Sequence, residues 1–190
     1  MGAILTQNTS WTNVRRAIVA LRQKKLLSAP AMEAISDSQL AELIRSSGYY
    51  RQKARKLKAF VRFLRTNYQG SLHRMFGVPT ELLRTELLSV HGIGPETADS
   101  ILLYAGARPV FVVDAYTRRI LQRHGLADQR HSYEEIRMSF EESLPADASL
   151  FNEYHALIVH TGKHFCRPKN PRCSECPLYS FLPPAIEEAR

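Results

Sequence analysis

The chain has 190 residues, 44% of them hydrophobic, which is enough for one domain with an ample core or for two small helical lobes that share an interface. Its 26 lysine and arginine residues outnumber 18 acidic residues, and the formal net charge of +8 favours an acidic polymer as partner. No apolar run is long enough to span a bilayer, and the first residues lack the basic start of a secretory signal. These features argue against a disordered, membrane-spanning or secreted chain, and we expect a cytoplasmic protein.

Apolar residues recur at helical spacing along almost the whole chain, and no segment alternates apolar and polar residues as a half-buried strand does. The sequence therefore predicts an all-α fold. One helix is expected within each of the segments 13–24, 36–48, 49–70, 78–92, 94–106, 114–123, 132–145 and 147–165. Residues 107–113 are expected to cross between two of these helices in extended form.

Three helix starts carry residue types that begin helices. Asp37 or Ser38 is the expected cap of the second helix, and Thr80 is the expected cap of the fourth. Pro95 is expected in the first turn of the fifth helix, where its missing N–H breaks no helical hydrogen bond. These signals place short helices on both sides of the sequence HGIG.

The helix within 49–70 carries basic residues and no acidic one. These residues are Arg51, Lys53, Arg55, Lys56, Lys58, Arg62 and Arg65. A solvated helix face accounts for most of them. Only those near the helix start, such as Lys53, are expected to contact phosphate.

The sequence HGIG predicts a tight turn between two helices. Gly92 and Gly94 can adopt backbone angles closed to other residues, while Ile93 can turn inward and hold the two helices together. The N–H groups around residues 92–96 then face outward at the positive end of a helix, a geometry that binds phosphate without reading bases. Glycine turns between helices are common, so the motif becomes specific only in combination with an aspartate further along the chain.

Asp114 comes after four apolar residues and opens the helix that carries Arg118 and Arg119. A simple helix cap is one interpretation, since aspartate is a preferred capping residue. The order of hairpin, helix, apolar crossing and aspartate is more specific than any of its parts. This order is the feature on which a family resemblance can be based.

With these motifs the chain resembles the endonuclease III superfamily of helix-hairpin-helix DNA glycosylases. LLSVHGIGPETADSILLY is similar to the family's hairpin, VVDAYTRRILQRHG to its aspartate helix, and AILTQNTSW and SGYYRQKARKL to the segments that fill the gap left by an extruded base. The resemblance implies a two-lobed fold with the DNA cleft between the lobes. Residues 1–108 would form a six-helix lobe with the hairpin at about 82–105, and residues 109–190 a second lobe with the aspartate helix and a cysteine loop. A further N-terminal helix of the relatives has no counterpart in this sequence.

In family members that also cleave the strand, a hairpin lysine attacks the sugar and forms a Schiff base, and Glu96 stands at that position here. A carboxylate cannot form an imine, so this lyase route is missing unless another amine, such as that of Lys163, replaces it. Glu96 either stabilises the first turn of a helix as an acidic residue or takes a direct part in catalysis. Asp114 alone suffices for hydrolysis, because an ionised carboxylate stabilises positive charge on the sugar and orients or deprotonates the attacking water.

The pattern GIGPETADSILLY is most similar to the 3-methyladenine DNA glycosylase branch related to endonuclease III. This resemblance implies a monofunctional base-excision repair enzyme that hydrolyses the N-glycosidic bond of an alkylated purine, such as 3-methyladenine, in double-stranded DNA. We expect a monomer associated with the nucleoid. Two alternatives stay open: a bifunctional endonuclease III-type glycosylase and AP lyase acting on oxidised pyrimidines, and a non-catalytic helix-hairpin-helix DNA-binding module.

The resemblance also assigns DNA contacts outside the hairpin. Gln7, Tyr49 and Tyr50 fall where the family inserts residues into the duplex, and an aromatic ring can stack into the hole left by a removed base. Ordinary packing at a helix start is the alternative for the two tyrosines. Trp11, the only tryptophan, either stacks on a cationic purine in the base pocket or belongs to the core.

The cysteines Cys166, Cys173 and Cys176 have the order Cys-x6-Cys-x2-Cys, which suits metal ligation better than a disulfide framework. The resemblance makes them the first three ligands of the family's [4Fe-4S] loop, whose cluster takes four thiolates. Where relatives have the fourth, this chain has Leu182. The alternatives are a cluster with a water or an unusual fourth ligand, a three-iron cluster, or a loop that has lost its metal. A zinc site would lack a fourth ligand as well.

Overall fold

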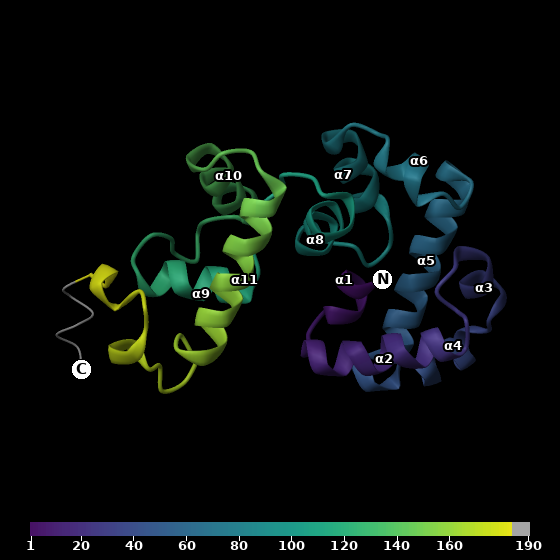
Figure 1. Cartoon of the computed structure of the whole chain (residues 1–190), viewed down its shortest axis with the longest axis horizontal. Coiled ribbons are helices and arrows are strands. Elements are labelled where there is room, and N and C mark those ends of the chain that lie inside the picture. The colour runs from purple at the N-terminus through teal and green to yellow at the C-terminus, as the bar shows by residue number, and fades with distance from the viewer. Residues whose placement is uncertain (184–190) are drawn as a thin grey trace. The chain divides into compact units, whose positions relative to one another are not determined.

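The computed structural model describes residues 1–183, which form eleven α-helices and three 3₁₀ helices and contain no strand (Figure 1). The all-α prediction is confirmed. The chain divides into two compact units, Met1–Ile101 and the part from Leu102 onward. This division falls within a helix, and Leu103 belongs to the core of the second unit. The functional boundary expected after residue 108 stays a prediction. Among the described residues, no helix is both long and apolar enough to cross a membrane.

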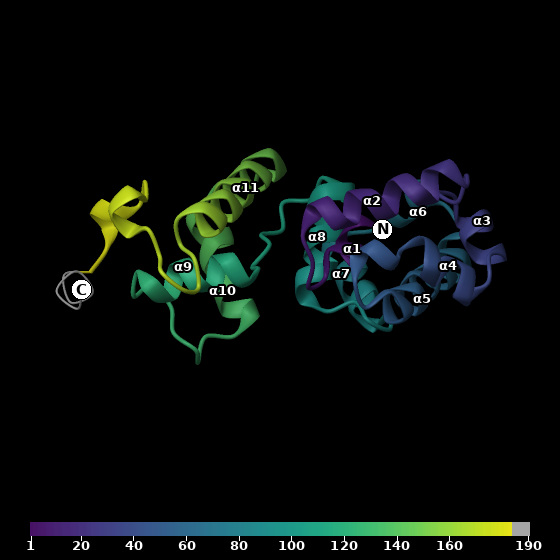
Figure 2. The same ribbon diagram turned by 90° about the horizontal axis from the view of Figure 1, so that it is seen from below.

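The first unit is organised around α5 (Tyr50–Tyr68), whose buried face includes Leu57, Val61 and Leu64, as the periodicity predicts. Helices that pack against α5 include α1 (Gly2–Thr6), α3 (Ala29–Ala34), α4 (Asp37–Leu43) and α6 (Leu72–Phe76). The remaining helix of the N-terminal part, α2 (Trp11–Gln23), contacts α1 and α4. Figure 2 shows α4 and α5 side by side. The unit is completed by α7 (Thr80–Ser89) and the first turns of α8 (Pro95–Gly106).

The cap of α4 lies one residue earlier than expected. Ser36, and not Asp37 or Ser38, accepts the Gln39 N–H at 3.3 Å, and the Gln39 side chain accepts the Ser36 N–H at 3.4 Å. This reciprocal pair needs a serine three residues before a glutamine, a spacing that only residue 36 provides. Thr80 is likewise not a cap, because Pro79 takes that position in α7 without a side-chain hydrogen bond.

The second unit consists of the end of α8 and five later elements: α9 (Ala115–Arg123), α10 (Tyr133–Ser143), α11 (Ala148–His164), and the 3₁₀ helices η2 (Cys173–Glu175) and η3 (Tyr179–Phe181). Between α8 and α9 the chain is not helical, as predicted, and Phe111 in this crossing is fully buried. Phe111 stacks on Phe140 of α10, with ring centroids 4.0 Å apart, and meets Phe151 of α11 edge-on at 5.5 Å. The apolar crossing is therefore the centre of this unit's core.

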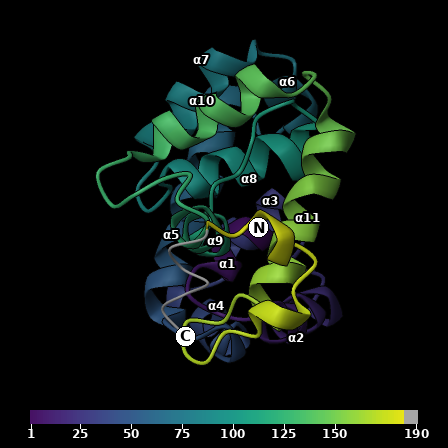
Figure 3. The same ribbon diagram turned by 90° about the vertical axis from the view of Figure 1, so that its left-hand side faces the viewer.

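The helices α9 and α11 cross closely in the second unit (Figure 1). Gly162 permits this approach, because a Cβ there would lie 2.6 Å from Tyr116 Cδ1. Arg119 of α9 adds two hydrogen bonds, from Nε to the Cys166 carbonyl at 2.6 Å and from Nη2 to the Gly162 carbonyl at 3.0 Å. The crossing thus fixes α9 against the start of the cysteine segment, drawn in yellow after α11 in Figure 3.

A buried ion pair joins the two helices of the hairpin. Arg84 of α7 donates from Nε to Asp99 Oδ1 at 2.6 Å and from Nη2 to Oδ2 at 3.1 Å. The Asp99 side chain is completely buried and that of Arg84 is 10% exposed. Because both charges are out of water, each depends on the other for its stability.

We expect Asp99→Ala to lower the free energy of unfolding of the first unit by about 3–5 kcal/mol, because it removes the carboxylate that pairs with the buried Arg84 guanidinium. Urea unfolding followed by circular dichroism and by the fluorescence of Trp11, which lies in this unit, measures the change. Glu42→Ala is the matched control, because it breaks an exposed pair with Arg45 worth at most about 1 kcal/mol. Equal stabilities of the two variants would contradict the prediction.

Candidate active site and cysteine loop

The hairpin between α7 and α8 has the predicted glycine turn. Gly92 has a φ of +83°, a conformation that favours glycine. Ile93 is buried and donates its N–H to the Val90 carbonyl at 3.0 Å, whereas Gly94 and the first residues of α8 are exposed. The turn therefore presents the start of a twelve-residue helix to solvent, where the helix dipole favours an anion.

Gln7 ties the segment after α1 to this hairpin. Its Nε2 donates to the Gly92 carbonyl at 3.0 Å and to Thr97 Oγ1 at 2.9 Å, and Lys56 Nζ donates to its Oε1 at 2.5 Å. The Lys56 stem covers Gly92 so closely that a Cβ at Gly92 would lie 2.3 Å from Lys56 Cγ. Sequence reasoning treated Gln7 as a duplex-inserting residue and Lys56 as one basic residue among many. The structure brings both onto the hairpin turn.

Tyr49 and Tyr50 lie at the start of α5 and differ in exposure. Tyr49 is 66% exposed and has a φ of +46°, an uncommon conformation for a bulky side chain. Tyr50 is half-buried, with the guanidinium groups of Arg45 and Arg51 5.8 and 6.0 Å from its ring centroid. Tyr49 is thus the tyrosine whose ring faces solvent, and its insertion into DNA stays a prediction.

Lys53 does not occupy the surface position expected of a phosphate contact. The residue is 2% exposed, and its Nζ donates to the carbonyls of Leu5 at 2.8 Å and Ser47 at 2.6 Å. Burial, with a smaller effect of the charge on Lys56, lowers the pKa of Lys53 to about 8. The assignment of Lys53 to direct phosphate contact is therefore corrected: its ammonium group joins the end of α1 to the turn before Tyr49. Helical periodicity had not separated this lysine from its exposed neighbours.

Asp114 is both a helix cap and a partner of another side chain. Its Oδ1 accepts the Thr117 N–H at 2.8 Å and the Thr117 hydroxyl at 3.0 Å, which is the capping interaction expected at the start of α9. Its Oδ2 lies 3.5 Å from Nε2 of His155, and the carboxylate is 14% exposed. The two interpretations of Asp114 are therefore compatible, because the cap uses one oxygen and leaves the other facing His155.

His155 is a residue of this site that sequence reasoning missed. It lies on α11, is buried, and forms a hydrogen bond between Nδ1 and the Tyr104 hydroxyl at the end of α8. Partial burial, together with the charge of Asp114, raises the pKa of Tyr104 to about 12, so this hydroxyl keeps its proton and can donate it to Nδ1. In the neutral ring the remaining proton is then on Nε2, which lies 3.5 Å from Asp114 Oδ2 and makes no hydrogen bond among the described residues. No sequence motif surrounds His155, and only the packing of α11 on α9 identifies it.

The pKa of Asp114 results from opposing effects. Burial, the largest effect, would raise the pKa of this carboxyl. The contact with His155 and the two hydrogen bonds from Thr117 outweigh burial, and the pKa is held below its ordinary value of 3.8. Asp114 is therefore an ionised carboxylate at neutral pH, in a largely buried site.

Glu96 and Lys163 lie on different helices. Glu96 is exposed in the first turn of α8, where an acidic side chain is favourable, and belongs to the first unit. Lys163 is exposed near the end of α11 in the second unit. A catalytic part for either residue stays a prediction. Trp11 is 59% exposed at the start of α2, close to Gly2, so it is not a core residue.

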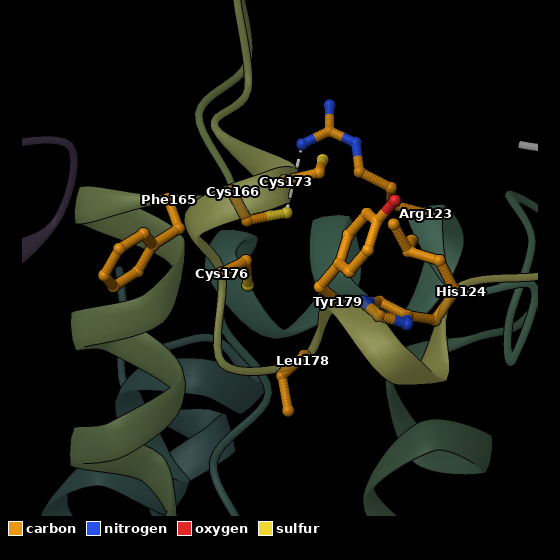
Figure 4. A pocket seen from close by; sticks show the side chains of 9 residues that line it. Arg123, His124, Phe165, Cys166, Cys173, Cys176, Leu178 and Tyr179 are labelled. Carbon is orange, nitrogen blue, oxygen red and sulfur yellow. Dashed lines mark hydrogen bonds between the residues drawn. The ribbon is translucent and has the colours of Figure 1, made fainter. Parts of the chain in front are cut away.

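The three cysteines line one pocket of the second unit (Figure 4). The other lining residues are Arg123, His124, Phe165, Leu178, Tyr179 and Leu182, and the pocket encloses about 220 Å³ that includes open solvent. Cys166 and Cys173 are buried and Cys176 is half-buried. Arg123 Nη1 donates a hydrogen bond to Cys166 Sγ at 3.1 Å.

The three cysteines of this pocket can supply three of the four thiolates that a [4Fe-4S] cluster takes. Leu182, the position at which the resemblance predicts a fourth ligand, lines the same pocket but has no donor atom. Among the described residues, no three His, Cys, Asp or Glu side chains are placed to hold a single metal ion.

Comparison with protein families gives two matches that account for most of the chain. Residues 1–146 match the HhH-GPD superfamily of base excision DNA repair proteins. Residues 166–181 match the iron–sulfur binding domain of endonuclease III. The first match contains the hairpin and Asp114, and the second contains the three cysteines.

Two curated relatives illustrate the similarity. A protein named provisionally as a DNA repair glycosylase, from Methanocaldococcus jannaschii, is 48% identical over 183 residues, which cover 95% of this chain and 82% of that protein. Endonuclease III of Thermotoga maritima is 31% identical over 93% of this chain and 77% of its own length.

Solved structures show the same fold. The H. pylori 3-methyladenine DNA glycosylase bound to 1,N6-ethenoadenine has a TM-score of 0.76 and 31% identity, over 85% of this chain and 82% of that one. An endonuclease III–DNA complex has a TM-score of 0.82 over 100% of this chain and 83% of that one, and at 24% identity it supports the fold alone.

We expect His155→Ala to raise the pKa of Asp114 relative to the unaltered protein, because one of the contacts that lower it is removed. In the unaltered protein the carboxyl should titrate below pH 3.8, so the stability that its ionisation contributes is present above that pH and is lost as the pH falls through the lowered pKa. Carbon-13 NMR titration of the carboxyl signals, assigned with Asp114→Asn, measures both values.

His155→Gln tests the cause, because its amide can still donate to Asp114 and should keep the pKa low. His160→Ala, at an exposed position of the same helix, should leave the titration unchanged. An unaltered Asp114 pKa in His155→Ala would refute the contact as its cause.

Proposed function

Because the chain belongs to the HhH-GPD superfamily of base excision DNA repair proteins, and is thus a DNA N-glycosylase, we propose that it releases alkylated purines such as 3-methyladenine from double-stranded DNA without cleaving the strand. The observation that carries this proposal is the state of Asp114. It is an ionised, largely buried carboxylate with one oxygen committed to the helix cap and the other facing His155.

Such a carboxylate suits base hydrolysis. Breaking the N-glycosidic bond builds positive charge on the sugar, and an ionised carboxylate in a poorly solvated site stabilises that charge more strongly than one in water. The same group can orient or deprotonate the attacking water. Chemistry that relies on a carboxylate alone requires a base that leaves readily, and a purine made cationic by alkylation meets this requirement.

The absence of a lysine in the hairpin supports the monofunctional mode. Glu96 stands where lyase members of the family carry their Schiff-base lysine, and its carboxylate cannot form an imine. Lys53 is no substitute in this structure, because its Nζ is buried between two backbone carbonyls.

The alkylated-purine assignment is supported by one solved relative. The H. pylori 3-methyladenine DNA glycosylase shares 31% identity and contains a modified adenine base in its structure. The pattern GIGPETA at residues 92–98, which first suggested this branch, begins at the hairpin turn that Gln7 and Lys56 contact.

We further propose that the cysteine loop holds a [4Fe-4S] cluster through Cys166, Cys173 and Cys176, with Leu182 in place of the usual fourth ligand. When bound, the cluster would cross-link the loop to the end of α11. Cys166 lies just beyond that helix, and basic residues Arg167, Lys169 and Arg172 lie between the first two cysteines. A loop fixed in this way can present those charges to phosphate.

We expect Asp114→Asn to lower the single-turnover rate of 3-methyladenine release by about 10²–10⁴-fold, because the neutral amide neither stabilises the charged sugar nor accepts a proton from water. Asparagine is also a preferred N-cap, so the fold and DNA affinity should be retained. Asp128→Asn, a solvent-facing carboxylate of the same unit, is the matched control. Wild-type rates in Asp114→Asn would reject the catalytic assignment.

Lesion panels and borohydride trapping separate the modes of action. Duplexes with alkylated, deaminated and oxidised bases should show release of alkylated purines, with strand cleavage only after alkali. A covalent adduct with borohydride, or preferential release of oxidised pyrimidines, would instead identify a bifunctional endonuclease III-type enzyme. Failure to release any lesion while duplex DNA is bound would identify a non-catalytic DNA-binding module.

A further inference from the structure

The pocket of the cysteine loop contains a side chain that can replace the missing thiolate. Leu182 has no lone pair, and Arg123 stays protonated, so neither can bind iron. The side chains of the lining set that can supply a further donor atom are His124 and Tyr179. Figure 4 labels both among the side chains that line the pocket.

The hydrogen bonding of His124 leaves the correct nitrogen available. Nδ1 lies 3.0 Å from the Phe181 carbonyl oxygen, and because a carbonyl can only accept, Nδ1 must carry the proton. The neutral ring therefore has its lone pair on Nε2, which makes no hydrogen bond to any of the described residues. Metal-ligating histidines typically have this arrangement, in which one ring nitrogen donates to a carbonyl and the other binds the metal.

The fold holds His124 firmly at this place. It is the C-cap of α9, with its N–H directed to the carbonyls of Ile120 and Gln122. Gly125 then turns the chain with a φ of +69°, which ends the helix at the pocket. The carbonyl that binds Nδ1 belongs to Phe181, the residue directly before Leu182. The imidazole is thus hydrogen-bonded to the segment around Leu182, where the resemblance predicts the fourth cysteine.

We propose that Nε2 of His124 is the fourth protein ligand of the iron–sulfur cluster in this chain, an inference that rests on the proposed cluster. The neutral imidazole binds iron through its lone pair without releasing a proton, whereas the Tyr179 phenol would first have to be deprotonated. Three thiolates and one imidazole carry one negative charge fewer than four thiolates. The cluster should therefore have a higher reduction potential than an all-cysteine cluster, as histidine ligation gives in other iron–sulfur proteins.

The test uses the full chain, purified without oxygen, with iron and sulfide measured per protein. Wild type should contain about four irons. Its reduced cluster should show a directly bound nitrogen in pulsed electron paramagnetic resonance, assigned to histidine by nitrogen-15 labelling of that residue type. His124→Cys should keep the iron, lose the nitrogen signal and lower the reduction potential.

His124→Phe should lose iron, and His124→Phe combined with Leu182→Cys should regain it, because the thiolate returns to the position that relatives use. His160→Ala, at an exposed histidine of α11, should change neither iron content nor spectrum. The rescue separates loss of a ligand from failure to fold, which circular dichroism checks independently.

Other outcomes would overturn the inference in distinguishable ways. A wild-type cluster without a bound histidine nitrogen, or full iron in His124→Phe, would reject His124 as ligand and leave the cluster standing. An iron-free wild-type protein would reject both the cluster and its ligand. Base excision is measured separately through Asp114, so neither result would decide the proposed enzyme activity.

Discussion

The carboxylate of Asp114 is held by two different structures, one at each oxygen. Thr117 binds Oδ1 as part of the cap that starts α9, and His155 of α11 faces Oδ2. The first contact is local and would form in any helix with this sequence, whereas the second requires α9 and α11 to cross. Burial opposes ionisation, and both contacts act against it by lowering the pKa of Asp114.

The helix α9 links this carboxylate to the cysteine pocket. Asp114 precedes the first residue of α9, and Arg123 and His124 lie at its end and line the pocket. A cationic side chain such as that of Arg123 is favourable there, at the negative end of the helix dipole. Nine residues span about 13 Å, which places the two sites at opposite ends of one rigid element. Gly162 lets this helix lie directly on α11. Any movement of the cysteine loop that tilts α9 would therefore also shift the carboxylate.

In the first unit, hydrogen bonds from lysine and glutamine side chains fix backbone segments that lie between helices. Lys53 holds the end of α1 and the turn before Tyr49, and Gln7 with Lys56 holds the glycine turn of the hairpin. These bonds join segments far apart in the sequence and leave the Tyr49 ring and the start of α8 exposed. The surfaces assigned to DNA are thus supported from inside by polar contacts, which cost little when every donor has a carbonyl or amide partner.

The sequence by itself determined the all-α fold, the glycine turn, the apolar crossing and Asp114 at a helix start, because helical periodicity, glycine backbone freedom and capping are local properties. It also indicated a metal-binding loop, because the three cysteines lie within one short segment of the chain. Only the tertiary structure decided that Lys53 is buried, that His155 faces Asp114 and that His124 lines the cysteine pocket. Each of these depends on which face of a helix meets another helix or loop, and a basic or histidine side chain looks the same in sequence whether it is solvated or enclosed.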